Sequence, residues 1–337
     1  MNEQQLQAAF TSATGQPAGR VARLPGGAGN RVYWRVHCRV DEGKTAVVME
    51  LPLDPLKSEE ASKHDAVELP FLNVHRYLER LYVRVPHLLL DAHKDGFVVL
   101  EDLTDRTLEM ALDGGDREAI YAAAIDQLAR LRKGAEDAPD PSCVAWTRAF
   151  DYDLYQWEFE HFIEYGLLAR GARPTDGELQ ELRVAFAQVS SELAAAPRSF
   201  THRDYQSRNI MVLHTGEQVV IDFQDALQGP RQYDLVALLR DSYVELDRPL
   251  IERMLSRYCQ RMAIADVGGF VAFFDLLTVQ RKLKDAGRFV FIDQVKKNPS
   301  FLVHISPSLH YVKDALARRP ELKRVSEILA KYVPELR

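Results

Sequence analysis

Runs of apolar, β-branched and aromatic residues near the N-terminus predict strands. Such residues predominate over residues 31–40 and 45–51, and the polar, glycine-containing segment 41–44 lies between the two runs. A short segment of this kind between two strand-like runs is typical of a β-hairpin. A further run, residues 97–100, predicts another strand, so we expect the chain to begin with a β-rich region.

Elsewhere apolar residues recur every three or four positions, the spacing of an amphipathic helix. This spacing predicts helices over residues 65–81, 117–132, 152–166, 177–196 and 233–243. Two short apolar runs after residue 208, residues 209–213 and 218–221, interrupt the helical region and predict a second hairpin, and residues 134–142 have the composition of a linker. The pattern therefore predicts an α+β protein with a β-rich N-terminal lobe, 1–102, and a larger, mainly helical lobe, 103–337.

Composition agrees with a globular protein of two lobes. The chain has 337 residues, of which 46% are hydrophobic and 27% charged, and this length exceeds what one hydrophobic core usually supports. Its net charge of −6 offers no general attraction to nucleic acid or anionic lipid. The three cysteines are widely spaced, and the N-terminus has no basic start followed by an apolar stretch. We expect a cytoplasmic protein that binds neither nucleic acid nor membranes.

The strongest chemical signal is the segment THRDYQSRN at residues 201–209. It fits H-R-D-x-x-x-x-N, the catalytic loop of protein-kinase-like phosphotransferases, and Asp222 follows Asn209 at the end of an apolar run. In such a loop the carboxylate of Asp204 can take the proton of an attacking hydroxyl group as a general base. Asn209 and Asp222 offer hard oxygen ligands of the kind that Mg²⁺ prefers alongside nucleotide phosphates.

Other interpretations of these residues are weaker. Asp and Asn are common in turns, so Asp204 and Asn209 could simply end strands. The chain has no G-x-x-x-x-G-K-[ST] loop, H-E-x-x-H helix or G-x-S-x-G elbow, which argues against the commonest ATPase, zinc protease and hydrolase classes.

The loop at 202–209, the segment Asp222–Asp225 and the run GPRQYDL at 229–235 together resemble the aminoglycoside phosphotransferase and choline kinase superfamily. Within it, residues 221–246 and 279–284 look like the kinases of cell-wall recycling that phosphorylate N-acetylmuramate and N-acetylglucosamine at the anomeric hydroxyl. The resemblance implies a bilobal protein-kinase-like fold, with ATP or GTP as co-substrate and Mg²⁺ as cofactor. It implies Asp204 as the base and, as metal ligands, Asn209 and Asp222 with help from Asp225.

The same resemblance implies how the nucleotide is bound. The backbone of residues 100–102 would meet the purine edge, and glycines at 26–29 would lie near the phosphates. Met49 stands where such kinases carry a phosphate-binding lysine, so Arg31 or Arg35 could supply the missing cation. The predicted nucleotide-binding residues are Gly27, Gly29, Arg31, Met49, Leu100, Glu101 and Asp102.

Four residues are predicted to contact the acceptor. Gln206 and Arg208 lie between the predicted base and the predicted metal ligand, and Arg240 and Asp241 form a polar pair further along. A basic helix face with Arg281 could meet a lactyl carboxylate, or it could simply be solvated. Asp234 resembles the family's structural carboxylate beneath the catalytic loop.

The sequence leaves three functions open. The leading one is an N-acetylhexosamine 1-kinase that acts as a monomer on an amino sugar. An alternative is a kinase for choline, homoserine or an aminoglycoside, since acidic residues between 151 and 164 could form a pocket for a cationic substrate. A non-catalytic nucleotide-binding regulator is a third, suggested by the missing lysine, although Asp204, Asn209 and Asp222 are all present.

Overall fold

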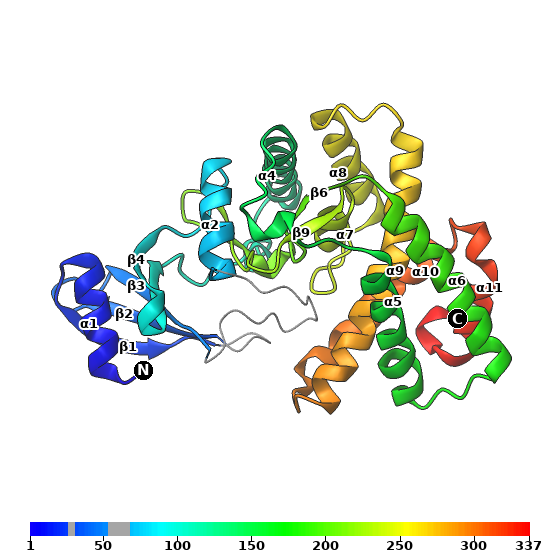
Figure 1. Cartoon of the computed structure of the whole chain (residues 1–337), viewed down its shortest axis with the longest axis horizontal. Coiled ribbons are helices and arrows are strands. Elements are labelled where there is room, and N and C mark those ends of the chain that lie inside the picture. Colours follow the sequence, from blue (N-terminus) through cyan, green and yellow to red (C-terminus); the bar gives the residue numbers. More distant parts are fainter. Residues whose placement is uncertain (26–30, 53–67) are drawn as a thin grey trace. The chain divides into compact units, whose positions relative to one another are not determined.

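The computed structural model describes residues 1–25, 31–52 and 68–337, which form two compact units (Figure 1). The first unit comprises Met1–Thr107 and Ile210–Asp225, and the second comprises Leu108–Asn209 and Ala226–Arg337. These units divide the chain differently from the expected lobes 1–102 and 103–337, because the segment Ile210–Asp225 groups with the N-terminal region.

The first unit is built on a five-stranded antiparallel sheet with the strand order β1-β2-β3-β5-β4. Its strands are β1 (Ala18–Arg23), β2 (Val32–Cys38), β3 (Thr45–Glu50), β4 (Leu88–Ala92) and β5 (Phe97–Glu101). Strands β2 and β3 form the predicted hairpin, in register from Val32 opposite Glu50 to His37 opposite Thr45. The strands expected at 31–40, 45–51 and 97–100 are therefore confirmed.

Helix α1 (Glu3–Thr14) covers part of this sheet, as Figure 1 shows for the first helix of the chain. Asn2 and Gln5 form a capping box at its start, which satisfies amide groups that the helix itself leaves unpaired. Its apolar face packs against residues of β2, β3 and β5 in one core cluster, which includes Leu6, Ala9, Phe10, Val36, Val48 and Val99. The sequence reading did not identify this helix.

The inserted segment adds a second hairpin to the first unit. Strands β7 (Ile210–Val212) and β8 (Gln218–Val220) pair where the sequence predicted a hairpin. Their edges bond to the rest of the unit, since the Val212 amide donates to the Arg106 carbonyl at 2.8 Å. Phe223 then stacks on Phe71 of α2 (Pro70–Arg80), with ring centroids 5.1 Å apart. The helix expected over 65–81 begins at Pro70, and residues 65–67 lie outside the described residues.

The second unit is mainly helical, with one two-stranded sheet formed by β6 (Arg198–Thr201) and β9 (Leu227–Pro230). Its helices are α3 (Leu108–Ala111), α4 (Arg117–Asp137), α5 (Tyr152–His161), α6 (Asp176–Ala195), α7 (Tyr233–Leu239), α8 (Arg248–Arg261), α9 (Val267–Gln294), α10 (Ile305–Leu316) and α11 (Lys323–Tyr332). The predicted helices are confirmed, but α4 continues through part of the expected linker and α7 ends before Tyr243.

Helix α9 is the longest helix, and it is largely buried. After α5 the chain continues through a wider π-helical turn, Phe162–Leu167, which packs against α9. A Cβ atom at Gly287 of α9 would lie 3.0 Å from the Phe162 backbone, so the close approach favours a glycine there. Within the part of the chain that the structure describes, no helix is long and apolar enough to cross a membrane.

Candidate active site

The loop that follows β6 is held from below by the first turn of α7. Asp234 of that turn is fully buried and accepts hydrogen bonds from the amides of His202 and Arg203, at 2.9 and 3.0 Å. Arg203 has a φ of 78°, a left-handed conformation that a residue other than glycine adopts only where its surroundings impose it. The expectation that Asp234 is a structural carboxylate beneath the loop is confirmed.

A second buried carboxylate supports the other end of the loop. Asp241 is 1% exposed, and it accepts hydrogen bonds from the amides of Ser207 and Tyr243 at 2.8 and 3.0 Å. Burial raises the pKa of Asp241, whereas these hydrogen bonds oppose that shift. Between the two supports, the Tyr205 hydroxyl donates to the Ala124 carbonyl of α4 at 2.9 Å. The loop backbone is thus fixed at three places.

Asp204 keeps a partly exposed carboxylate on this fixed loop, with 36% of its side chain accessible. The Asn209 side-chain amide donates to the Asp204 carbonyl at 2.9 Å, so its nitrogen is used within the loop and its oxygen is the end suited to a cation. Arg281 of α9 also reaches the loop, at the carbonyl of Arg203 and the carboxylate of Asp204. The arrangement offers a proton acceptor whose backbone is immobilised on both sides.

The predicted metal-binding segment lies at the end of the inserted part of the first unit. Asp222 is exposed and has a φ of 63°, while the neighbouring Phe223 is buried. The Gln224 side-chain amide donates to both neighbouring carboxylates, at 2.8 Å to Asp222 and 3.2 Å to Asp225. Two carboxylates fixed by one amide form a donor set of hard oxygens, so the residues present fit a Mg²⁺ ion.

The predicted nucleotide-binding residues of the first unit differ from one another in burial and in hydrogen bonding. Met49 is fully buried in the sheet core, and the Glu101 amide donates to the His87 carbonyl at 2.9 Å, so this amide is already paired. The Arg31 side chain forms a hydrogen bond with Tyr33. Burial raises the pKa of Tyr33 to about 12. Gly27 and Gly29 lie outside the described residues.

Arg35, a candidate for the missing phosphate-binding cation, pairs with Asp102, a predicted nucleotide-binding residue. The Arg35 guanidinium meets both Asp102 oxygens, at 2.5 and 3.0 Å, and also contacts Asp105 at 2.9 Å. A guanidinium held by two carboxylates has little remaining attraction for phosphate. Leu100 is buried on β5, and the Glu101 carboxylate pairs with Arg84 at 2.6 Å. These contacts argue against Arg35 as the substitute for the missing lysine.

The four predicted acceptor contacts separate into two pairs. Gln206 is half-buried on the loop, and Arg208 pairs with Glu109 at 2.6 Å while its guanidinium lies 3.8 Å from the centre of the Tyr243 ring. Both side chains are only partly buried, so both stay predicted acceptor contacts. Arg240 and Asp241, by contrast, are 4% and 1% exposed. Both Asp241 oxygens accept hydrogen bonds from the backbone, and the Arg240 guanidinium pairs with two carboxylates. This burial and pairing argue against direct contact with an acceptor.

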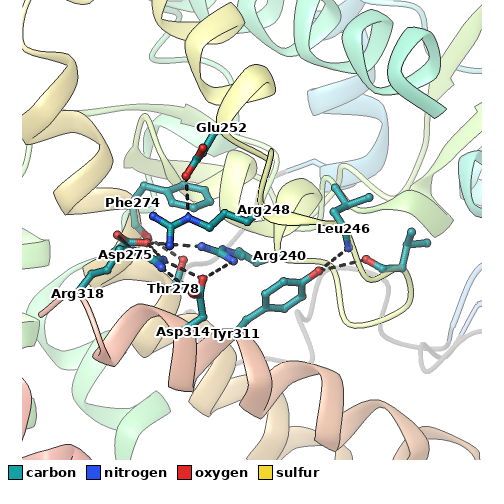
Figure 2. Close-up of polar contacts among 11 residues, drawn as sticks. Arg240, Leu246, Arg248, Glu252, Phe274, Asp275, Thr278, Tyr311, Asp314 and Arg318 are labelled. Atoms are coloured by element: carbon teal, nitrogen blue, oxygen red, sulfur yellow. Dashed lines mark hydrogen bonds and ion pairs between the residues drawn. The ribbon is translucent and has the colours of Figure 1, made fainter. Parts of the chain in front are cut away.

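Figure 2 shows what surrounds Arg240 instead. Its guanidinium lies 2.9 Å from Asp314 of α10 and 3.6 Å from Asp275 of α9, and it lies over the Tyr311 ring. Arg318 joins the same two carboxylates, at 2.6 Å to each. Burial lowers the pKa of Arg240, and the neighbouring carboxylates of Asp314 and Asp275 offset this effect only in part. Arg240 is therefore part of a buried ion-pair network that joins the end of α7 to α9 and α10.

Comparison with known proteins identifies the family. A model of the phosphotransferase enzyme family matches residues 20–269, well over half of the chain. The chain belongs to this family. Two relatives are named N-acetylmuramate/N-acetylglucosamine kinase. The one from Pseudomonas aeruginosa is 32% identical over 269 residues, 77% of each chain. The one from Pseudomonas putida is 30% identical and covers 93% of this chain and 88% of its own.

Solved structures of a choline kinase and an aminoglycoside phosphotransferase share the fold. A choline kinase from Streptococcus pneumoniae matches with a TM-score of 0.63 at 15% identity, covering 93% of this chain and 99% of that one. An aminoglycoside 2′-phosphotransferase in complex with GDP matches with a TM-score of 0.61 at 15% identity, covering 95% and 100%. The expected protein-kinase-like fold, an antiparallel sheet followed by a mainly helical region, is confirmed.

Proposed function

We propose that this protein transfers the γ-phosphate of Mg-ATP or Mg-GTP to the anomeric hydroxyl of N-acetylmuramate, N-acetylglucosamine or both. The observation that carries the proposal is the 32% identity to a relative of that name over 77% of each chain. Phosphoryl transfer itself is supported by the family match and by the presence of Asp204, Asn209 and Asp222 in the family's motif.

In this mechanism the loop residues have separate tasks. Asp204 would accept the proton of the sugar hydroxyl as the new P–O bond forms, and the fixed backbone on either side would keep its carboxylate in place. Asn209 and Asp222, with Asp225, would hold Mg²⁺, which when bound would neutralise charge on the nucleotide phosphates. A partly exposed base and few protein ligands suit a reaction that depends mainly on positioning and charge.

Three of the acidic residues between 151 and 164 that kept an aminoglycoside acceptor open have other roles in the second unit. Asp151 caps α5 by accepting the Leu154 amide at 2.8 Å. Glu158 is fully buried and accepts from Gln280 at 2.6 Å, while Glu160 pairs with Arg183 at 2.9 Å. These three carboxylates face a helix terminus, the core and the surface, so they do not converge on one pocket for a polycation.

The deciding experiment is a turnover screen of the purified full chain with Mg-ATP and Mg-GTP. Acceptors should include N-acetylmuramate, N-acetylglucosamine, choline, homoserine and kanamycin, and phosphorus NMR would locate the transferred phosphate. We expect a sugar phosphate whose phosphorus couples to the proton at carbon 1. Turnover of another acceptor alone would retain the kinase and reject the sugar specificity.

A matched control tests whether the anomeric oxygen is the nucleophile. The 1-O-methyl glycoside of N-acetylglucosamine keeps every hydroxyl except the anomeric one. It should not be phosphorylated if the anomeric oxygen is the nucleophile. Equal turnover of the glycoside would move the reaction to a different hydroxyl, and nucleotide binding without any turnover would favour the non-catalytic regulator.

A further inference from the structure

We propose that Arg281 of α9 is a positioning residue for the base, holding the catalytic loop and the carboxylate of Asp204 in their reactive arrangement. This inference rests on the proposed phosphotransfer by Asp204, because it describes how the base is held. The sequence placed Arg281 on a basic helix face. In the structure its guanidinium instead points to the loop.

Two contacts connect Arg281 to the loop. Nη1 donates to the Arg203 carbonyl at 2.8 Å, and Nη2 lies 3.4 Å from Oδ1 of Asp204. The first bond fixes the peptide plane immediately before the base, while the second is an ion pair with the base itself. One rigid, planar group therefore constrains both the backbone and the side chain of the same residue.

The surroundings of Arg281 fix the guanidinium in turn. Its side chain is 2% exposed, and the guanidinium carbon lies 4.6 Å from the centre of the buried Tyr233 ring in the first turn of α7. The next residue back, Gln280, bonds to the buried carboxylate of Glu158 on α5. Burial alone would lower the pKa of Arg281, but Tyr233 and nearby carboxylates, first Asp285 and then Asp204, raise it. A charged and enclosed guanidinium holds the Asp204 carboxylate in a better-defined position than a flexible surface cation would.

The other contacts of the loop leave this task to Arg281. Asp234 bonds to the amides of His202 and Arg203, Asp241 bonds to the Ser207 amide, and Tyr205 is anchored to α4. All of these act on backbone or on a neighbouring side chain. Arg281, by contrast, forms an ion pair with the Asp204 carboxylate itself. Loss of Arg281 should therefore leave the loop folded while the carboxylate samples other rotamers.

Steady-state kinetics of Arg281→Met, Arg281→Lys, Asp204→Asn and the double variant with Asp204→Asn and Arg281→Met would test this role. We expect Arg281→Met to lower kcat by about 10–100-fold, the range that a misplaced catalytic group can cost. The KM values for nucleotide and acceptor should stay within about twofold, and Arg281→Lys should recover part of kcat. In the Asp204→Asn background the same substitution should cost almost nothing, since Arg281 acts through Asp204.

The matched control is Arg318→Met, which removes another arginine that is paired with carboxylates and packed near α9 but that does not contact the loop. It should lower the melting temperature while kcat at 25 °C is unchanged. A raised acceptor KM with unchanged kcat in Arg281→Met would overturn the proposal in favour of direct acceptor binding. Equal losses in the wild-type and Asp204→Asn backgrounds would also overturn it, because the effect would then not pass through the base.

Hydrogen exchange of the peptide at 201–209 gives a readout that needs no turnover. Arg281→Met should accelerate its exchange more than Arg318→Met does, since the Arg203 peptide loses its bond to Nη1. If no acceptor is turned over, the proposed function fails while this measurement still decides the structural claim. Unchanged exchange together with unchanged kcat would remove Arg281 from any positioning role.

Discussion

Asp204 is the residue on which the proposed chemistry depends most directly. We expect Asp204→Asn to lower kcat by about 10²–10⁴-fold, because the amide has nearly the same shape but cannot accept the hydroxyl proton. Nucleotide affinity should change little, since the predicted metal ligands remain. Initial-rate kinetics and nucleotide titration would measure the two quantities.

Asp176→Asn provides a control for this substitution, since Asp176 is an exposed residue in the first turn of α6. It should retain the wild-type kcat. Asp204→Asn with a kcat within threefold of the wild type would contradict the role of general base.

Residues defined by a local motif could be predicted, whereas residues defined by burial could not. The motif spacing of Asp204 and Asn209 was enough to predict the loop, and the family resemblance implied Asp234 as the buried carboxylate beneath it. Arg240 and Asp241 look equally polar in sequence, but residues far away in the chain enclose them. The loop contact of Arg281 was missed for the same reason, since it joins positions 77 and 78 residues apart.

At the scale of elements, the Arg240 network determines how α7, α9 and α10 are joined. Arg240→Met should destabilise the fold by up to about 3–5 kcal/mol, because it leaves the buried Asp275 and the partly exposed Asp314 with one cation fewer. The acceptor KM should not change beyond what a lower folded fraction explains. Urea unfolding and steady-state kinetics at low urea would separate the two effects.

Arg253→Met is the comparison for Arg240, since Arg253 pairs with Glu118 at 3.0 Å and both side chains are about half exposed. Its cost should stay below about 1 kcal/mol, as for other exposed ion pairs. A large increase in the acceptor KM of Arg240→Met, with unchanged stability, would instead restore the substrate contact that the sequence suggested.

Glu178 connects α6 to α11 and predicts a pH dependence of stability. It forms a capping box with Thr175 and binds Lys331 and Tyr332 at 2.7 and 2.6 Å. Its hydrogen bonds, first that from Lys331, lower the pKa of Glu178 from 4.5 to about 2. A lowered carboxyl pKa stabilises the fold above the unfolded value and loses this effect as the pH falls towards the folded value.

Glu178→Gln should therefore lower the melting temperature at pH 7, and its difference from the wild type should shrink as the pH falls from 4.5 towards 2. Scanning calorimetry across this range would measure the difference. Glu192→Gln, on the same helix but 56% exposed, should have little effect at any of these pH values. A difference that stays constant with pH would mean that the Glu178 charge contributes nothing to stability.

Elements with a clear apolar pattern were predictable, and those that depend on distant pairing were not. Strands β3 and β5 contain short continuous apolar runs, and β2 is rich in β-branched and aromatic residues, so the sequence shows each of them directly. Strand β4 has alternating burial and only five residues, and it becomes a strand by pairing with β5. Helix α9 is buried on most sides, so its apolar residues give little of the periodicity that reveals an amphipathic helix.

At the scale of the whole molecule, the residues expected to carry the reaction come from both compact units. Asp204 and Asn209 belong to the second unit, whereas Asp222 and Asp225 belong to the first. The sequence boundary at residue 102 assumed that a lobe is one continuous segment. The return of residues Ile210–Asp225 to the first unit depends on pairing with a distant part of the chain, which linear composition does not report.

Ligand-dependent stability tests the metal-binding prediction without requiring turnover. A ligand that binds only the folded state at 100 times its Kd stabilises that state by about 2.7 kcal/mol. We expect Mg-ATP to raise the melting temperature, and we expect part of that rise to disappear when EDTA removes the metal. Asp222→Asn should lose most of this Mg²⁺-dependent part, since a neutral amide is a weaker ligand than a carboxylate.

Two further variants, Asp225→Asn and Asp91→Asn, serve as the intermediate case and the control in the same measurement. Asp225 shares the Gln224 amide with Asp222, so its substitution should remove a smaller part of the Mg²⁺-dependent shift. Asp91 lies on β4 and pairs with His93, so Asp91→Asn should keep the whole shift. If Asp222→Asn also keeps it, Asp222 is not a metal ligand, and the resemblance that assigned it fails at that position. If all three variants lose the shift equally, the effect comes from general negative charge on the first unit rather than from a specific site.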